Sequence, residues 1–157
     1  MSARLNAFEI PTVGKALKHI GAAGKVIHDS SLPVATQNMV TLRASQINGC
    51  GFCTDMHFKD AVAAGEDTVR LNLVAAWREA TVFSEAERAA LALTEEGTRI
   101  ADAAGGVPDE VWENAAKHYD EEQLGALVSL IALINAYNRL NVMVQQPAGS
   151  YRPGQFA

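Results

Sequence analysis

The sequence predicts an all-α protein, folded as a single domain of six to seven helices. Strong helix formers such as Ala, Leu and Glu dominate, and apolar residues recur at spacings of three and four. Runs in which β-branched and polar residues alternate, which would indicate strands, do not occur. A chain of 157 residues is long enough to bury roughly 68–70% of its unfolded surface. We expect one domain over residues 1–157, with an extended N-terminal segment (1–11) and a C-terminal arm (147–157).

Four helices are expected in the first half of the chain. Gly21 to Gly24 lies within the first and would let another backbone approach closely. Pro33 suits the first turn of the second helix, and Asn48 is a good cap for the third, which Gly65 would end. The expected helices span residues 12–29, 33–46, 50–64 and 67–77.

Three further helices are expected in the second half. Ser84 with Glu87, and Asp120 with Gln123, each have the spacing of a capping box, which begins a helix. Pro108 suits the first turn of the helix between them. Proline and glycine residues after position 146 predict an extended arm rather than more helix. The expected helices span residues 84–103, 108–118 and 120–144.

Composition narrows the classes of function. The net charge is −5 and basic residues do not cluster, which argues against binding to nucleic acid or to an anionic membrane. The first eleven residues have no apolar stretch of the kind found in signal peptides. The most apolar segment, 124–137, is interrupted by polar residues and is too short to cross a bilayer. We therefore expect a cytoplasmic protein without membrane or nucleic-acid partners.

The two cysteines and one histidine form the most informative motif. Cys50 and Cys53 lie about 60° apart around the expected helix, and His57 lies within about 20° of Cys50. All three side chains thus share one face. The first turn of a helix favours a thiolate, and an imidazole can exchange a proton near neutral pH. In a reducing compartment this pattern indicates redox chemistry or a metal site.

Other interpretations of the motif have less support. A thioredoxin-like site would need a preceding strand, and the sequence predicts none. Two cysteines that only pack in the core are also possible. The stretch from Gly21 to Gly24 follows no strand, so it is not a dinucleotide loop, and we expect no cofactor and no metal. A zinc ion would need a further ligand, either water or one of His19, His28 and His118.

The motif also resembles that of a known family. Cys50-x-x-Cys53-x-x-x-His57 on an all-α background is similar to the AhpD-like alkylhydroperoxidases, within the carboxymuconolactone decarboxylase superfamily. The preceding Ala44-Ser45-Gln46-Ile47-Asn48-Gly49 and the later Ala75-Ala76-Trp77-Arg78 resemble its core-domain branch. The resemblance implies that Cys53 attacks a hydroperoxide, Cys50 resolves the product as a disulfide, and His57 relays protons. Asn38 stands where that family has a relay glutamate, so we expect low activity.

The resemblance also implies partners. It points to a hydroperoxide substrate, to an external thiol or lipoyl reductant, and to a homo-oligomer built from trimers, such as a hexamer. The apolar first and last helices independently favour a partner subunit, and the C-terminal arm could lie along that neighbour. The alternatives are a non-redox lactone enzyme of the same superfamily and a non-catalytic module that senses oxidation.

Two further groups of polar residues bear on the structure. Asn135, Asn138 and Asn141 recur at helical spacing, which predicts hydrogen bonds between helices or a place beside the thiols. Glu95 and Glu96 are expected on a solvated face, and Trp77 is expected in the core or at an interface.

Overall fold

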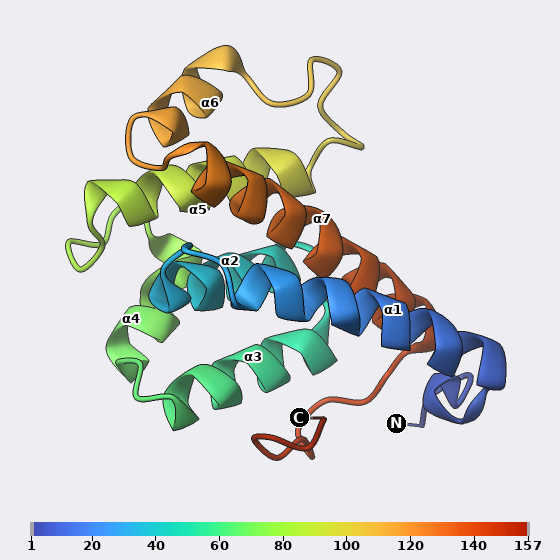
Figure 1. Cartoon of the computed structure of the whole chain (residues 1–157). Coiled ribbons are helices and arrows are strands. Elements are labelled where there is room, and N and C mark those ends of the chain that lie inside the picture. The colour runs from blue at the N-terminus through green and yellow to red at the C-terminus, as the bar shows by residue number, and fades with distance from the viewer. Residues whose placement is uncertain (1, 157) are drawn as a thin grey trace.

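The computed structural model describes residues 2–156, and every regular element in this range is helical (Figure 1). The all-α fold class is thus confirmed. The α-helices in this range are α1 (Pro11–His28), α2 (Val34–Ile47), α3 (Gly51–Ala63), α4 (Thr68–Leu73), α5 (Glu85–Thr98), α6 (Asp109–Ala116) and α7 (Glu121–Val144). Short 3-10 turns at Ala7–Glu9 and Val74–Ala76 precede α1 and follow α4.

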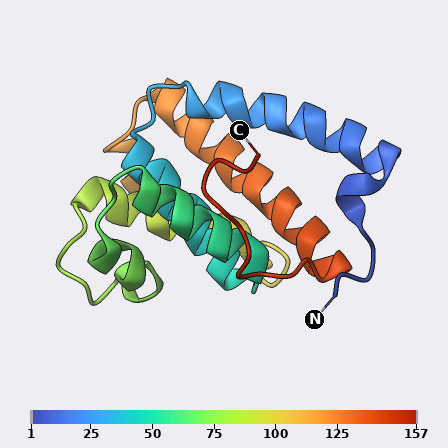
Figure 2. The ribbon, with the colours of Figure 1, turned by 90° about the horizontal axis from the view of Figure 1, so that it is seen from below.

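Helix α7 runs through the middle of the molecule and contacts α1, α2, α3, α5 and α6 (Figures 1 and 2). A capping box begins it, because Asp120 accepts from the Gln123 N–H and the Gln123 side chain accepts from the Asp120 N–H. Its 24 residues would suffice to cross a membrane by length and composition alone, although the apolar segment 124–137 within it is too short to do so. Its buried residues, such as Leu127 and Ile134, face other helices of the bundle.

Two large groups of buried apolar side chains form most of the core, and a third, small group consists of Cys50, Phe52 and Cys53. One large group includes Val40 of α2 and Leu127 of α7. The other large group includes Met39 of α2, Leu91 of α5, and Trp77, which directly follows the 3-10 turn after α4. Helix α2 contributes to both groups. It therefore holds the start of the following helix, α3, firmly against the rest of the bundle.

Glu95 on α5 lies in this interior, which corrects the expectation of a solvated face for Glu95 and Glu96. Its side chain is 1% exposed and accepts hydrogen bonds from Trp77 Nε1 (2.9 Å) and Arg43 Nε (2.7 Å), with Arg78 as a further partner. Burial alone would raise the pKa of Glu95, but Arg78, Trp77 and Arg43 together lower it. A buried carboxylate is tolerated here because three donors satisfy it. Glu96 beside it is half-buried.

Several boundaries differ from those expected. The fourth helix ends at Leu73 and continues as the 3-10 turn, and α5 ends at Thr98 rather than near residue 103. The N-terminal segment is not simply extended, because it contains the turn Ala7–Glu9 and α1 already begins at Pro11. Such ends are set by local hydrogen bonding, which sequence patterns place only to within a few residues.

The C-terminal arm folds back onto its own chain (Figure 2). Lys59 Nζ of α3 donates to the carbonyl oxygens of Gly149 and Tyr151, each at 3.1 Å. The Tyr151 hydroxyl donates to the Asp60 carboxylate at 2.9 Å. The arm therefore lies against α3 instead of hanging free in solvent.

Candidate functional site

The two cysteines lie where the chain passes from α2 into α3. Helix α2 ends at Ile47, and Gly49 then takes a left-handed conformation (φ 64°) that turns the chain. Cys50 is the N-cap of α3, and its sulfur accepts a hydrogen bond from the Cys53 N–H at 3.4 Å. The expected cap, Asn48, instead lies at the end of α2. The glycine turn separates it from α3, so its side chain is free to bond elsewhere.

The two sulfurs are buried and close together. Cys50 Sγ and Cys53 Sγ lie 2.8 Å apart, with the Cys50 thiol donating, and Asn141 Nδ2 donates to Cys53 Sγ at 3.3 Å. The hydrogen bond from Cys50 lowers the pKa of Cys53 to about 7, against the opposing effect of burial, and Asn141 assists. The same sulfur–sulfur contact, together with burial, raises the pKa of Cys50. Cys53 is thus the thiol that ionises first.

A row of amides from α7 supports this turn. Asn48 Nδ2 donates to Asn135 Oδ1 and to Asn138 Oδ1, both at 2.9 Å. Asn138 Nδ2 in turn donates to Ser45 Oγ at 3.1 Å. These bonds confirm the expected hydrogen bonding between helices for Asn135 and Asn138. One turn further along the same face, Asn141 reaches the sulfur of Cys53.

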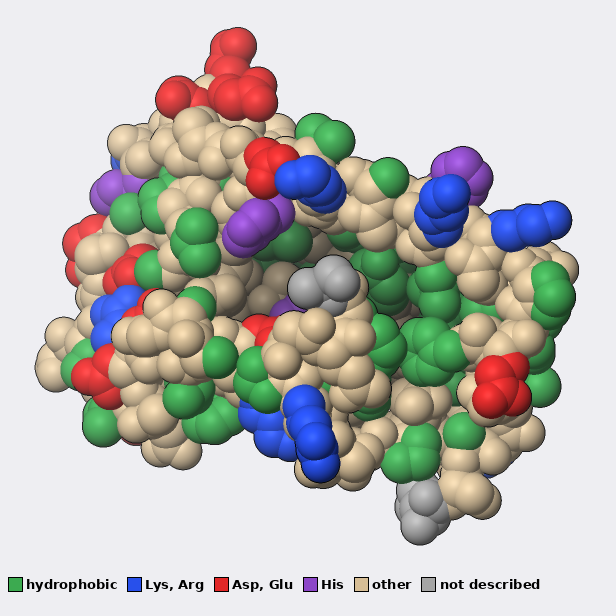
Figure 3. Space-filling model, turned by 60° about the horizontal axis from the view of Figure 1, so that its bottom comes forward, with side chains coloured by type: hydrophobic (Ala, Val, Ile, Leu, Met, Phe, Trp, Pro, Cys, Tyr) green, Lys and Arg blue, Asp and Glu red, His purple; other side chains and the backbone are tan. Residues whose placement is uncertain are grey.

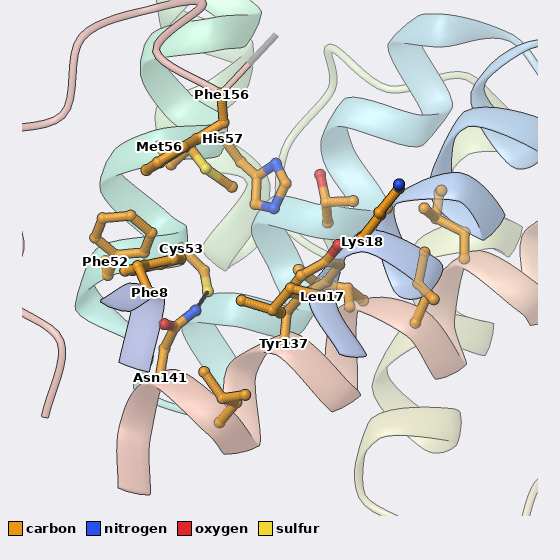
Figure 4. A pocket seen from close by; sticks show the side chains of 17 residues that line it. Phe8, Leu17, Lys18, Phe52, Cys53, Met56, His57, Tyr137, Asn141 and Phe156 are labelled. Carbon is orange, nitrogen blue, oxygen red and sulfur yellow. Dashed lines mark hydrogen bonds between the residues drawn. The ribbon is translucent and has the colours of Figure 1, made fainter. Parts of the chain in front are cut away.

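Cys53 opens on an apolar pocket of about 560 Å³ (Figure 4). The pocket lies between α1, α3 and α7, and its polar side chains near the sulfur are His57 and Asn141. Leu17 and Lys18 come from α1 and Tyr137 from α7. Other residues that line it are Phe8, Phe52, Met56, Leu130, Leu133, Ile134, Leu140 and Phe156.

Aromatic side chains from both ends of the chain cover one side of this pocket. The ring of Phe156 stacks on Phe8, with centroids 5.6 Å apart, and on Tyr151 at 5.8 Å. Phe52 of α3 lies against the same three rings. Figure 3 shows hydrophobic side chains gathered along a hollow on this face of the molecule. The two termini thus help to build the pocket wall.

Within residues 2–156, two polar atoms in the pocket lack a hydrogen-bond partner. These buried atoms are His57 Nε2 and Asn141 Oδ1. Burial lowers the pKa of His57 to about 4, so the imidazole is neutral at neutral pH. Unsatisfied buried polar atoms are costly and uncommon, and a pair of them beside a reactive sulfur suits a polar group of a bound ligand.

The structure brings together the three residues that the sequence singled out, Cys50, Cys53 and His57, although no hydrogen bond joins His57 to either sulfur. Asn38 is half-buried on α2 and does not line the pocket. Asn141 has the place beside the thiols that was one of the two expected for the three asparagines, although the sequence did not distinguish it from Asn135 and Asn138. No group of three metal-ligating side chains occurs within residues 2–156. The other histidines, His19, His28 and His118, are exposed.

Comparison with known proteins decides the family. The model of the carboxymuconolactone decarboxylase family matches residues 11–96, which include the dithiol and more than half of the chain. This chain belongs to the carboxymuconolactone decarboxylase family. The AhpD-like branch, to which the motif pointed, lies within that superfamily.

Three relatives of this family member are informative. It is 39% identical to the uncharacterized protein YdfG of Bacillus subtilis, over 96% of this chain and 99% of YdfG. It is 31% identical to the uncharacterized protein YnjA of Escherichia coli, over 76% of this chain and 64% of YnjA. A crystal structure of the Agrobacterium tumefaciens protein ATU0492, of unknown function, matches with a TM-score of 0.87 and 32% identity, over 96% of this chain and 100% of that one. A role as the antioxidant defence protein AhpD has been suggested for ATU0492.

Proposed function

We propose that this carboxymuconolactone decarboxylase family member is a thiol-dependent peroxidase that reduces organic hydroperoxides through Cys50 and Cys53. The observation that carries the proposal is the setting of Cys53. Its sulfur faces an apolar pocket, and its pKa is lowered to about 7. At pH 7 such a thiol is about 50 times more ionised than one with a pKa of 9.0.

The reaction follows from the two sulfurs. The Cys53 thiolate attacks the terminal oxygen of the hydroperoxide, the O–O bond breaks, and the alkoxide leaves with a proton as the alcohol. Cys53 is then a sulfenic acid. Cys50, whose sulfur lies 2.8 Å away, displaces that oxygen as water and forms the disulfide. Two thiols and one hydroperoxide thus give one disulfide, one alcohol and one water.

The unpartnered atoms of the pocket suit the hydroperoxide group. His57 Nε2 and Asn141 Oδ1 are buried beside Cys53 and can accept hydrogen bonds from an O–H group. The imidazole of His57 can also take up the proton that the Cys53 thiol releases and pass it to the departing alkoxide. We assign His57 to proton relay and Asn141 to holding the Cys53 thiolate.

The rest of the pocket indicates the class of substrate. Apart from Lys18, Thr41 and two glycines, its remaining wall is made of Leu, Ile, Met and aromatic side chains, which favour an apolar organic group over hydrogen peroxide. An apolar wall contributes to binding mainly because the apolar part of the substrate leaves water when it enters the pocket.

Two other functions make different demands on the cysteines. A lactone enzyme without redox chemistry does not need both thiols. A sensor of oxidation forms the disulfide but does not turn over. Both are distinguished from a peroxidase by the experiment below.

We also propose the setting in which the protein works. A reductant such as an external thiol or a lipoyl group must return the disulfide to the dithiol, and a cytoplasmic location would provide it.

We further propose a homo-oligomer built from trimers. Among the residues of α1 only Ile27 is buried, and Val26 beside it is 73% exposed. Light scattering after size exclusion should give a multiple of three chains, and the mass of one chain would contradict this.

The function is tested with single cysteine variants and cumene hydroperoxide. The wild-type protein with dithiothreitol should produce cumyl alcohol over many turnovers. Cys53→Ser should produce none, whereas pre-reduced Cys50→Ser in the absence of dithiothreitol should produce one equivalent and stop as a sulfenic acid. Equal activity of wild type and Cys53→Ser would refute the proposal. A single turnover by the wild type would favour the sensor.

A further inference from the structure

The two cysteines of the dithiol line different hollows, which share Asn141 as a wall residue. Cys53 lines the apolar pocket, and Cys50 does not. Cys50 instead lines a second hollow of about 440 Å³, which does not include Cys53. We call this second space the tail hollow. It lies between the turn before α3, the end of α7 and the start of the C-terminal arm, and its wall includes Gly51, Val142 and Ala148.

The backbone around the tail hollow keeps it open. Gln145 ends α7 in a left-handed conformation (φ 55°, ψ 50°), the one non-glycine residue with positive φ among those described. This strained residue directs the arm past Cys50. A Cβ atom on Gly51 would stand 3.4 Å from Ala148 Cβ, so any longer side chain there would fill the hollow.

The geometry of thiol–disulfide exchange decides which sulfur an external thiol can attack. The attacking sulfur, the attacked sulfur and the leaving sulfur lie nearly in line. An approach to Cys50 Sγ therefore comes from the side away from Cys53, and the tail hollow is lined by Cys50 but not by Cys53. Cys53 is also the better leaving group. Asn141 Nδ2 donates to its sulfur and can stabilise it as the departing thiolate.

We propose that an external dithiol enters the tail hollow and reduces the Cys50–Cys53 disulfide by attack on Cys50, whereas the oxidant reaches Cys53 through the apolar pocket. This inference rests on the proposed function, since it concerns the reductive half of that cycle. A thiolate of the reductant bonds to Cys50 Sγ, and the sulfur–sulfur bond breaks with its electron pair on Cys53. The second thiol of the reductant then displaces Cys50 and closes its own disulfide. The protein gains the two electrons and two protons that the reductant loses.

The first test identifies the attacked sulfur. The protein is oxidised with diamide, treated with excess glutathione, and quenched at once with N-ethylmaleimide. Trypsin leaves both cysteines in one peptide, residues 44–59, and fragment ions locate each adduct. Glutathione should be on Cys50 and N-ethylmaleimide on Cys53. The reverse arrangement would overturn the proposal.

The second test fills the tail hollow. Val142 is a half-exposed helical valine in its wall, and Val69 on α4 is an exposed helical valine outside both hollows. Val142→Phe should slow reduction of the disulfide by dithiothreitol at least tenfold, and Val69→Phe should leave that rate unchanged. Oxidation of reduced Val142→Phe by cumene hydroperoxide should stay within twofold of wild type. Reduction of Val142→Phe at the wild-type rate would overturn the proposal.

Controls separate this inference from the proposed function. Circular dichroism checks the fold of each variant, and Ala148→Phe replaces Val142→Phe if the latter does not fold. Because diamide forms the disulfide, its reduction can be measured whether or not the protein reacts with hydroperoxides. A protein that is inert to hydroperoxide but shows the predicted adducts would contradict the peroxidase function alone.

Discussion

Replacing His57 with leucine should remove a pH dependence of folding stability between pH 7 and pH 5. His57 Nε2 is buried without a partner, and burial lowers the pKa of the imidazole from 6.5 to about 4. In the unfolded chain the pKa returns to about 6.5. Between these two values the unfolded state binds a proton that the folded state does not, so the free energy of unfolding falls as the pH falls.

The size of this effect follows from the two pKa values. The slope approaches about 1.4 kcal/mol per pH unit, which gives a loss of up to about 2 kcal/mol between pH 7 and pH 5. The carboxyl groups of Glu87 and Glu95 have lowered pKa values and stabilise the fold above their unfolded values near 4.5. Their contribution is lost mainly below pH 5, outside this window.

Urea unfolding at pH 7 and pH 5 measures the effect. The free energy of unfolding of the wild type should fall by about 2 kcal/mol more than that of His57→Leu. His118→Leu, which removes an exposed imidazole, should behave as the wild type. Parallel losses in wild type and His57→Leu would refute the reasoning.

Three further substitutions have defined outcomes. Asn141→Ala removes a hydrogen bond to the Cys53 thiolate, so the pKa of Cys53 from pH-dependent alkylation should rise by about 1–2 units, and an unchanged profile would contradict this. Glu95→Ala leaves Arg43 without its buried partner and should lower the free energy of urea unfolding by about 3–5 kcal/mol, whereas a loss below 1 kcal/mol would not fit. Gln145→Gly relieves a left-handed residue, and the same measurement should show a gain of about 0.5–1 kcal/mol rather than a loss.

Local patterns predicted the elements of this fold well. The capping boxes at Ser84 and Asp120 begin α5 and α7 where expected, because a capping box needs only residues within one turn. Cys53 and His57 lie one turn apart on α3 and line one pocket, as their spacing indicated, whereas Cys50 is the N-cap of that helix and lines a separate hollow. The prediction that Asn48 caps α3 was wrong. Gly49 adopts a left-handed conformation that turns the chain between Asn48 and α3, and the sequence alone does not show this turn.

Features that depend on distant segments could not be predicted. Glu95 has the charge of a surface residue, and its burial requires Arg43 on α2 and Trp77 beyond α4 to meet it in space. The pocket joins residues from α1, α3, α7 and both termini, so no single stretch of sequence contains it. The tail hollow likewise depends on the arm returning past Cys50.

The central claim is that Cys50 and Cys53 together reduce a hydroperoxide. The most direct measurement is the intact mass of the reduced protein before and after one equivalent of cumene hydroperoxide, with alkylation of the remaining thiols. We expect a loss of two hydrogen atoms per chain, no alkylation at either cysteine, and one equivalent of cumyl alcohol. An unchanged mass with both cysteines still open to alkylation would contradict it.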